Sequence, residues 1–502
     1  MQVVLVLLSI LTISLAFPFE IPFIKSSPLQ QTHWKNEALN QNRREEVKRA
    51  FKHAWSGYRK YAWGHDELRP NTDTPADPRN GWGATILDSL DTLIIMGLDE
   101  ELKEAREHVA NLDWRKTKYP IVQVFETNIR YLGGLLSAYD LTGDRLYLEK
   151  ARELADLLMP CFESETGIPY QNVDIRSGRP VKSGLPNGSS DLAEMGTLQL
   201  ELAHLSHLTR NYTYYEKAKR VVDILEGLEQ PYPGLYPIFI NPTNGDYETN
   251  YITIGGGGDS FYEYLFKMYL YEGKSSQQYR SMYEKSMDTI ENLLLVKTAN
   301  RSDLVQLSSI RGNQLIYYMD ELSCFLPGNL LLASKVLNNK RYEKMAADLL
   351  KTCVNAWTST ATGIAPESWY YVESTGKRSA EFGSLENQHR AETWGFWPSA
   401  PFYILRPETI ESLFYFYRLT GDTQYQDVGW KIFKSIDLYC KTPSGFSGLN
   451  DVTRLDGGQN NNQESFFFAE TLKYLYLLFS PDTIPLDKWV FNTEAHPFRI
   501  PN

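Results

Sequence analysis

The chain has 502 residues, of which 42% are hydrophobic and 23% charged, so it can bury a large core, and wholesale disorder is excluded. It carries 51 Lys and Arg against 62 Asp and Glu, a net charge of −11, which argues against a nucleic-acid-binding protein because such proteins present a basic face. The chain also has 32 Tyr, 23 Phe and 11 Trp. Aromatic rings with carboxylates suit a carbohydrate pocket, and an aromatic core explains this composition equally well.

The first element is an apolar run, MQVVLVLLSILTISLAF, of about fourteen hydrophobic residues that ends in the small-x-small pattern Ser14-Leu15-Ala16. It is shorter than the roughly 20 apolar residues of a membrane span, and no basic cluster precedes it. We therefore predict a cleaved signal peptide at 1–16, an N-terminal extension at 17–40, a single domain at 41–502 and no membrane span after cleavage. The protein is expected to be secreted or to reside in the lumen of the secretory pathway.

Cysteines and glycosylation sequons fit such a compartment. The cysteines show no CxxC spacing, which disfavours a metal or redox motif and permits disulfides: Cys161, Cys324, Cys353 and Cys440. Three pairings are possible, and their spacing does not choose among them. The N-x-S/T sequons are expected on surface loops: Asn187, Asn211 and Asn300.

A recurring pattern organises the rest of the chain: an acidic helix start, an apolar helix, a short polar turn and an amphipathic second helix. The turns occur at LTGDRLYLEKA (141–151), LTRNYTYYEKA (208–218), LNNKRYEKMA (337–346) and LTGDTQYQDVGW (419–430). Seven first helices are expected at GWGATILDSLDTL (81–93), VFETNIRYLGG (124–134), DLAEMGTLQLELA (191–203), GGDSFYEYLFKMY (257–269), MDELSCFLPGNLLL (319–332), RPETIESLFYFY (406–417) and NQESFFFAETLKYLY (462–476).

These helical hairpins start 43 to 87 residues apart, and five of the six spacings exceed the roughly 34 to 47 residues of tetratricopeptide or HEAT repeats. Units of this kind form either an open solenoid or a closed ring. In a closed ring the apolar first helices would line the inside, and the acids at their heads would converge at one mouth. We therefore predict an all-α fold in a single domain of about 450 residues.

The acids at the helix heads have two explanations. An Asp or Glu in the first turn stabilises a helix by about 0.3–1 kcal/mol through the helix dipole, which accounts for any one of them. Acids at the heads of all seven apolar helices, with the second helices not following this rule, favour a functional cluster that holds a hard cation or transfers protons. Zinc is disfavoured, because the eight His residues show no HxxxH or HxH spacing. The sequence also has no EF-hand loop.

Three acids on separate units are candidates for chemistry. Glu126 lies one helical turn before Arg130. Asp259 follows four glycines, which permit close approach to a ligand, although a glycine-rich loop capped by an Asp is also common. Glu408 follows an Arg-Pro pair, and proline at the first helical position fixes the helix start. Two carboxylates, one protonated and one ionised, are the usual apparatus of glycoside hydrolysis.

These motifs resemble those of the class I α-1,2-mannosidases, glycoside hydrolase family 47. The resemblance spans about residues 45–498 through GWGATILDSLDTL, FETNIRYLGGLLSAYDLTGD, GDSFYEYL, CFLPG, GIAPES, RPETIESLFYFYRLTGD, ESFFFAETLKYLYLLFS and VFNTEAHPF, in that order. It implies an (α/α)7 barrel of seven helical hairpins with small loop or hairpin insertions, and makes 41–502 a catalytic domain. It also implies a calcium-dependent inverting hydrolase that removes terminal α-1,2-linked mannose from high-mannose N-glycans. We expect a monomer that binds these glycans and no nucleic acid.

The resemblance assigns roles to individual residues. Glu126 in FETNIR matches the family's proposed general acid, Asp259 in GDSFYEY its second catalytic carboxylate, and Glu408 in RPET its proposed general base, although which is acid and which is base stays open. Thr493 in FNTEAHP matches the residue that ligates Ca²⁺ through its hydroxyl and carbonyl oxygens. The side chains expected to bind substrate or to hold calcium-bound waters are Asp66, Glu263, Glu367, Arg406, Glu411, Glu464 and Glu494. The family also pairs the cysteines that match Cys324 and Cys353.

Two positions depart from the family pattern. Glu321 stands where relatives often have His in M-x-H-L-x-C-F, and we expect it to be structural. Gly257 stands where relatives that remove a single mannose resemble an Arg-bearing loop, so an open site and broader trimming are expected. The alternative to an enzyme is a non-catalytic mannose-binding lectin or a degradation-targeting relative on the same fold, and the intact candidate carboxylates argue against it.

Overall fold

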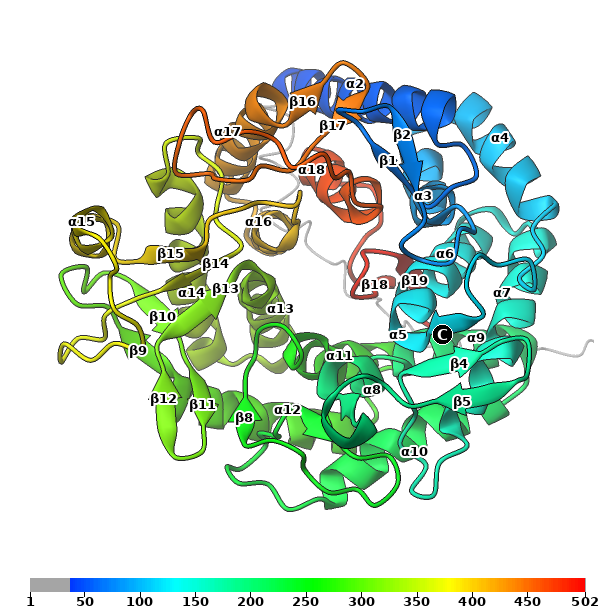
Figure 1. The fold of residues 1–502 in the computed structure, drawn as a ribbon, viewed down its shortest axis with the longest axis horizontal. Helices are drawn as coiled ribbons and strands as arrows, with labels where there is room; N and C mark the ends of the chain where they lie inside the picture. Colours follow the sequence, from blue (N-terminus) through cyan, green and yellow to red (C-terminus); the bar gives the residue numbers. More distant parts are fainter. Residues whose placement is uncertain (1–36, 502) are drawn as a thin grey trace, which may run out of the picture.

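The protein is described here by a computed structural model that covers residues 37–501. The expected signal peptide and most of the expected N-terminal extension lie outside these residues. The described helices form two concentric rings about one axis, and the chain travels round them from its N-terminal to its C-terminal end (Figure 1). The prediction of an all-α closed ring, in preference to an open solenoid, is confirmed.

The inner ring consists of the apolar first helices, as predicted. They are buried nearly all round because they are enclosed on both sides, and every residue of the fourth one from Ser260 to Tyr271 is buried. Each contacts the next, and the ring closes where the π-helix η7 (Phe467–Thr471) meets the first of them. In chain order they are α3 (Ala84–Ile95), α6 (Gly133–Thr142), α9 (Gln199–Thr209), α11 (Asp259–Tyr271), α13 (Leu326–Leu337), α16 (Glu408–Thr420) and α18 (Leu472–Leu478).

The outer ring consists of amphipathic helices that bury one face; the first of them buries only Ala105 and Val109. Six follow their inner partners along the chain: α4 (Asp99–Ala110), α7 (Arg145–Leu158), α10 (Thr213–Gly227), α12 (Gln277–Thr289), α14 (Lys340–Ser359) and α17 (Gln424–Tyr439). The remaining outer helix, α2 (Glu37–Tyr61), precedes all the others and packs against α18. The two ends of the described chain therefore combine to make the seventh hairpin.

The repeated LTGD sequence acts as a helix stop followed by a helix start. Gly143 ends α6 in the left-handed conformation (φ 72°), and Gly421 ends α16 in the same way (φ 74°). Asp144 then caps α7 by accepting a hydrogen bond from the backbone N–H of Leu146 at 3.1 Å. The short turn makes inner and outer helices antiparallel neighbours.

Small antiparallel sheets are inserted between the helices. Those with three strands are β3 (Ile121–Gln123), β4 (Asn172–Asp174) and β5 (Arg179–Val181); β12 (Gln314–Ile316), β11 (Ser309–Arg311) and β8 (Tyr251–Ile252); and β13 (Tyr318–Asp320), β14 (Ser368–Tyr370) and β15 (Trp397–Ala400). The two-stranded pairs are β1 (Glu67–Arg69) with β2 (Thr74–Ala76), β6 (Ser190–Asp191) with β7 (Phe239–Ile240), β9 (Leu295–Lys297) with β10 (Val305–Leu307), β16 (Lys441–Thr442) with β17 (Gly445–Phe446), and β18 (Trp489–Phe491) with β19 (Pro497–Arg499).

The β18–β19 hairpin has a special position, because it lies inside the inner ring (Figure 1), where it contacts α11 and α6. The remaining short helices are α5 (Val124–Glu126), η2 (Thr127–Leu132), η3 (Met159–Phe162), η4 (Pro186–Gly188), α8 (Leu192–Gly196), η5 (Ile290–Leu294), η6 (Glu321–Phe325) and α15 (Leu385–Thr393). Among residues 37–501, no helix is both long and apolar enough to cross a bilayer.

One disulfide joins the inner and outer rings. Cys324 on η6 and Cys353 on α14 are bonded, with Cα atoms 5.9 Å apart, as the family resemblance implied. Cys161 and Cys440 are buried free thiols, and burial raises the pKa of both. The sequon residues are all exposed, and their occupancy stays a prediction: Asn187, Asn211 and Asn300.

Candidate active site

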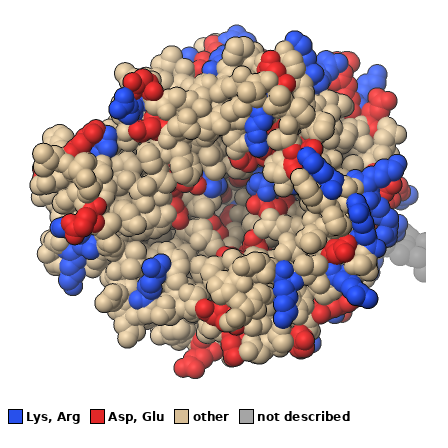
Figure 2. Space-filling view, in the orientation of Figure 1, with Lys and Arg blue, Asp and Glu red and all other residues tan. Residues whose placement is uncertain are grey.

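A central hollow opens on the axis of the ring, with acidic and basic side chains inside it (Figure 2). It is a cavity of about 260 Å³ whose polar lining is Glu126, Arg130, Asp191, Glu194, Asp259, Ser260, Glu263, Arg406, Glu408, Glu411, Glu470, Thr493 and Glu494. Apolar side chains complete the wall: Phe125, Ile129, Ala193, Leu322, Phe325 and Phe466. Five of the seven inner-helix heads contribute an acid to this cavity. A pocket with an apolar wall and convergent polar groups is the usual form of a small-ligand site.

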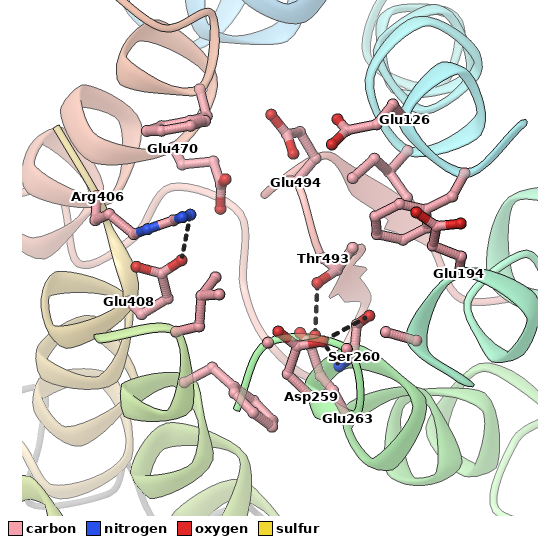
Figure 3. Close-up of a pocket in the computed structure, with 18 of the residues that line it drawn as sticks. Glu126, Glu194, Asp259, Ser260, Glu263, Arg406, Glu408, Glu470, Thr493 and Glu494 are labelled. Carbon is pink, nitrogen blue, oxygen red and sulfur yellow. Dashed lines mark hydrogen bonds and ion pairs between the residues drawn. The ribbon is translucent and has the colours of Figure 1, made fainter. Parts of the chain in front are cut away.

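Asp259 is presented by a glycine loop that only glycine can form. Gly257 has φ +91°, in the left-handed region that side chains disfavour. A Cβ at Gly258 would lie 2.1 Å from the carbonyl oxygen of Thr253. The loop therefore folds tightly enough to start α11 at Asp259, whose Oδ1 accepts a hydrogen bond from the backbone N–H of Ser260 at 2.7 Å (Figure 3).

Glu408 is the first residue of α16, and its position is fixed by a buried acid behind it. Glu321 Oε1 accepts hydrogen bonds from Thr409 Oγ1 at 2.7 Å and from Trp357 Nε1 at 3.0 Å. These bonds anchor the first turn of α16 to η6 and α14, so the carboxylate of Glu321 does structural work at this helix start. In front, Arg406 Nη1 lies 3.7 Å from Glu408 Oε1 (Figure 3).

Glu126 ends α5, where the chain continues as the π-helix η2. Such segments are rare and often occur at functional sites. Arg130 Nε donates to Glu126 Oε2 at 2.6 Å, and Arg79 Nη1 lies 2.9 Å from the same oxygen. Burial by itself would raise the pKa of Glu126, but Arg130 and Arg79 outweigh it and lower the pKa to about 2. Glu126 is therefore an ionised carboxylate.

Asp259 and Glu408 behave in the opposite way. Burial raises the pKa of Asp259 to about 8, and the nearby carboxylate of Asp320 adds to the rise. Burial also raises the pKa of Glu408 to about 7, although Arg406 opposes the rise. Among the three candidate acids, neighbouring guanidinium groups lower the pKa of Glu126, whereas burial raises the pKa of Asp259 and of Glu408.

Thr493 lies at the bottom of the cavity, in the turn between β18 and β19. Its hydroxyl donates to Glu263 Oε2 at 2.7 Å (Figure 3). Lys267, wholly buried beneath, pairs with Glu263 and lies 3.9 Å from Glu411 Oε1. On the other side of the turn, Glu494 pairs with Arg130. The turn therefore brings a hydroxyl oxygen among carboxylates whose charge is only partly balanced.

Three of the residues expected to bind substrate or hold calcium-bound waters do not line the cavity. Asp66 is buried. Its carboxylate accepts hydrogen bonds from the Tyr131 hydroxyl and from five backbone N–H groups, those of Arg79, Gly81, Trp82, Gly83 and Ala84. Glu367 binds Arg406 through both of its carboxylate oxygens, at 2.7–3.0 Å. Glu464 lies 3.7 Å from Arg79. These three side chains contact Arg406, which lines the cavity, or Arg79, which pairs with Glu126. Their roles in binding substrate or calcium-bound water stay predictions.

Several lining residues were not predicted from the sequence. Glu470 lies in the π-helix η7 and lines the cavity, whereas the sequence predicts Glu464, six residues earlier at the start of the same motif. Asp191 and Glu194 stand at the head of the third unit, where the helix-head rule already pointed. Burial raises the pKa of Glu194 to about 7.

Within residues 37–501, no group of three or more His, Cys, Asp or Glu side chains is arranged to hold a metal ion directly. The negatively charged groups that line the cavity are carboxylates, the type of ligand that hard cations prefer.

Carboxylates that converge on an apolar-walled cavity, inside a double ring of helices, are the arrangement expected of a glycoside hydrolase. Comparison with known proteins makes the assignment specific. The sequence pattern of glycosyl hydrolase family 47 matches residues 50–500, and the chain belongs to this family.

Similar proteins are found in plants, animals and fungi. Mannosyl-oligosaccharide 1,2-alpha-mannosidase MNS1 of Arabidopsis thaliana is 45% identical over 92% of this chain and 80% of its own length. Human mannosyl-oligosaccharide 1,2-alpha-mannosidase IB is 40% identical over 91% of this chain and 70% of its own length. The solved alpha-1,2-mannosidase of Trichoderma reesei has a TM-score of 0.88 and 37% identity, covering 92% of this chain and 99% of that one.

Proposed function

We propose that the protein is an exo-acting α-1,2-mannosidase that removes terminal α-1,2-linked mannose from high-mannose N-glycans. The observation that carries the proposal is the convergence of Glu126, Asp259 and Glu408 on one cavity, in a chain that belongs to family 47. The β18–β19 turn occupies the inner end of this cavity, so only the end of a sugar chain can enter. That geometry supports removal of terminal residues over cleavage within a chain.

The contrasting charge states support distinct roles for the carboxylates. Near neutral pH, Asp259 keeps its proton, since its pKa is about 8, and can donate it to the oxygen of the departing sugar. Glu408 begins α16 beside Arg406, which opposes the rise in its pKa, and in its ionised form it can take a proton from the attacking water. This assignment departs from the family pattern, in which the residue matching Glu126 is the proposed acid.

Glu126 takes a different part in this proposal. A carboxylate whose pKa is about 2 is ionised throughout the working range and cannot hold a proton to donate. Glu126 lines the cavity while Arg79 and Arg130 hold its carboxylate, so in this proposal it orients the water or sugar hydroxyl groups next to it.

Ca²⁺ is part of the proposal, and the residues present fit it. Burial, followed by repulsion from Glu494, Glu408 and Glu411, raises the pKa of Glu470 well above its ordinary value. A cation among these carboxylates would relieve that repulsion. Thr493 would hold the ion, with waters held by the surrounding acids, and the bound ion would orient sugar hydroxyls and help to activate water.

Gly257 supports broad branch specificity. A side chain here would begin 2.9 Å from Asp191 Oδ2 and would point into the cavity wall that Gly256, Gly257 and Asp191 share. The φ of +91° adds backbone strain to any substitution. With glycine the mouth beside Asp259 stays open, so several glycan branches could dock.

The compartment is also proposed. The disulfide between Cys324 and Cys353, the exposed sequons and the apolar N-terminal run all suit the lumen of the secretory pathway or secretion. We further propose that the chain works as a monomer, because the site is assembled from elements of one ring.

The test is release of mannose from α-1,2-mannobiose by the purified protein, with Ca²⁺ and with a chelator in excess. Release with Ca²⁺ that stops on chelation, and returns when Ca²⁺ is added back, is expected. Binding of the disaccharide without release, at saturating Ca²⁺, would instead favour a mannose-binding lectin. Equal release with and without the chelator would remove Ca²⁺ from the proposal and leave the hydrolase.

A further inference from the structure

The turn that carries Thr493 is stabilised by hydrogen bonds to one of its own side chains, that of Asn492. Asn492 Oδ1 accepts hydrogen bonds from the backbone N–H groups of Glu494 at 2.9 Å and His496 at 2.8 Å. Ala495 has φ +60°, so the turn passes through the left-handed region at a residue that has a side chain. A turn of this shape needs outside support to persist.

That support comes from a chain of buried charges beneath the cavity, the floor network of Asp88, Asp91, Lys473 and His496. Lys473 Nζ donates to the carbonyl oxygen of Ala495 at 2.7 Å and lies 2.9 Å from Asp91 Oδ1. The His496 ring lies between the two aspartates, with Nδ1 2.8 Å from Asp91 Oδ2 and Nε2 3.1 Å from Asp88 Oδ1. All four side chains are 0% exposed.

The two carboxylates of the floor network are each paired with basic side chains. Burial opposes a charge on His496, but Asp91 and the hydrogen bonds to both aspartates outweigh it and raise the pKa of the imidazole. Burial would likewise raise the pKa of Asp91, yet Lys473 and His496 lower it. Asp91 therefore lies against Lys473 and His496, and Asp88 lies against His496 and, at 3.5 Å, against Arg130 Nη1, so each buried carboxylate has basic partners. Loss of one charge leaves its partner uncompensated at the base of the turn.

Contacts on the other side leave the turn no room to move. Asn492 Nδ2 donates to the carbonyl oxygen of Ile129 at 2.9 Å and to Glu201 Oε1 at 2.8 Å. A Cβ on Gly133 of α6 would lie 2.7 Å from Asn492 Nδ2 and 2.8 Å from His496 Cδ2. The turn is thus pressed against α6 on one side and bonded to α3 and α18 on the other.

We propose that the floor network is a set of positioning residues that fix the Thr493 turn, so that its oxygen atoms face the cavity and set the affinity for Ca²⁺. The inference rests on the proposed function, because Ca²⁺ binding at Thr493 is part of it. None of the four side chains lines the cavity. They act through the backbone of the turn, as supporting residues behind a metal ligand commonly do.

The test measures Ca²⁺ binding directly, by calorimetric titration of the chelator-stripped full chain with Ca²⁺ alone. We expect Asp91→Asn, which keeps the shape and removes the charge, and Lys473→Met, which removes the bond to Ala495, to weaken Ca²⁺ binding about tenfold or more. At saturating Ca²⁺ the kcat of both variants for α-1,2-mannobiose should return to near the wild-type value.

The control is Arg43→Met. Arg43 on α2 pairs with Asp427 on α17 at 2.7 Å, far from the cavity, so its loss should lower the melting temperature and leave the Ca²⁺ affinity unchanged. If folded Asp91→Asn and Lys473→Met bind Ca²⁺ within twofold of wild type, the positioning role is overturned, whatever happens to their melting temperatures.

A milder variant covers the case in which neither protein folds. Ser137 Oγ donates to Asp91 Oδ2 at 3.0 Å, so Ser137→Ala should weaken Ca²⁺ binding by about two- to threefold, and an unchanged affinity overturns the inference. Failure of the wild-type chain to bind Ca²⁺ would be a different result. It would contradict the proposed cofactor itself and take the positioning role with it.

Discussion

The disulfide between Cys324 and Cys353 permits a prediction with a worked magnitude. The bond closes a loop with a sequence separation of 29 residues. In the chain-entropy model, removing a crosslink that closes a loop of this length destabilises the folded state by about 3.6 kcal/mol. Unfolding entropy of about 2.1 cal/mol/K per residue, over the roughly 465 described residues, comes to about 1 kcal/mol/K, so the melting temperature should fall by about 4 °C.

The assay is differential scanning calorimetry of Cys324→Ala, Cys353→Ala and the double variant at one scan rate. Both cysteines are 0% exposed, so packing loss is an alternative cause of destabilisation. The two causes separate cleanly, because either single variant already removes the crosslink. We expect each single variant to lose about as much stability as the double variant. A double variant that loses the sum of the two single losses, or a wild-type melting temperature in all three, would refute the reasoning.

Three further predictions follow from the same structure. Arg406 lowers the pKa of Glu408, so Arg406→Met should move the acid limb of the kcat/KM profile to higher pH; an unmoved limb would exclude Glu408 as the base. Gly134→Ala places a Cβ 2.3 Å from the Leu87 carbonyl oxygen and should cost more than about 2 kcal/mol in denaturant unfolding. Gly227→Ala, with no atom within 4 Å, is its control and should be neutral or gain up to about 1 kcal/mol. Digestion of a nine-mannose glycan should continue past the first mannose, and a clean stop there would count against an open site at Gly257.

The ring itself was predictable from the sequence because its determinants are local. The LTGD turns contain their own stop and start signals in Gly143 and Asp144, and the apolar first helices differ visibly from the amphipathic second ones. The closure by α2 was not predictable in this way. It joins the two ends of the described chain, and nothing in the order of the units says which segment covers α18.

The site was predictable in kind more than in detail. The helical period of 3.6 residues locates the helices and therefore the acids at their first turns. It does not reveal the π-helix η7, which sets the position of Glu470. The depth of each helix along the axis is also a tertiary property. Gly134 lets α6 approach Leu87 of α3 closely. In this packing Asp88 and Asp91 of α3 lie below the cavity, where they bind His496 in the floor network.

The charge state of Glu126 illustrates why roles are harder to predict than positions. The sequence places Arg130 one turn away, but Arg79 comes from a distant loop and joins it only in the folded protein. With both guanidinium groups present, the pKa of Glu126 falls to about 2. An acid that matches a proton donor by motif is, by its surroundings, an ionised group.

The most direct test of the account is kcat/KM for α-1,2-mannobiose and its α-1,3-linked isomer in saturating Ca²⁺, for wild type, Asp259→Asn and the Arg43→Met control. We expect mannose release from the α-1,2-linked disaccharide alone, a loss of about 10²–10⁴-fold in Asp259→Asn, and wild-type activity in Arg43→Met. The proposed function would be contradicted if wild type released no mannose or cleaved both isomers equally. The proposed role of Asp259 would be contradicted if Asp259→Asn retained most of the activity.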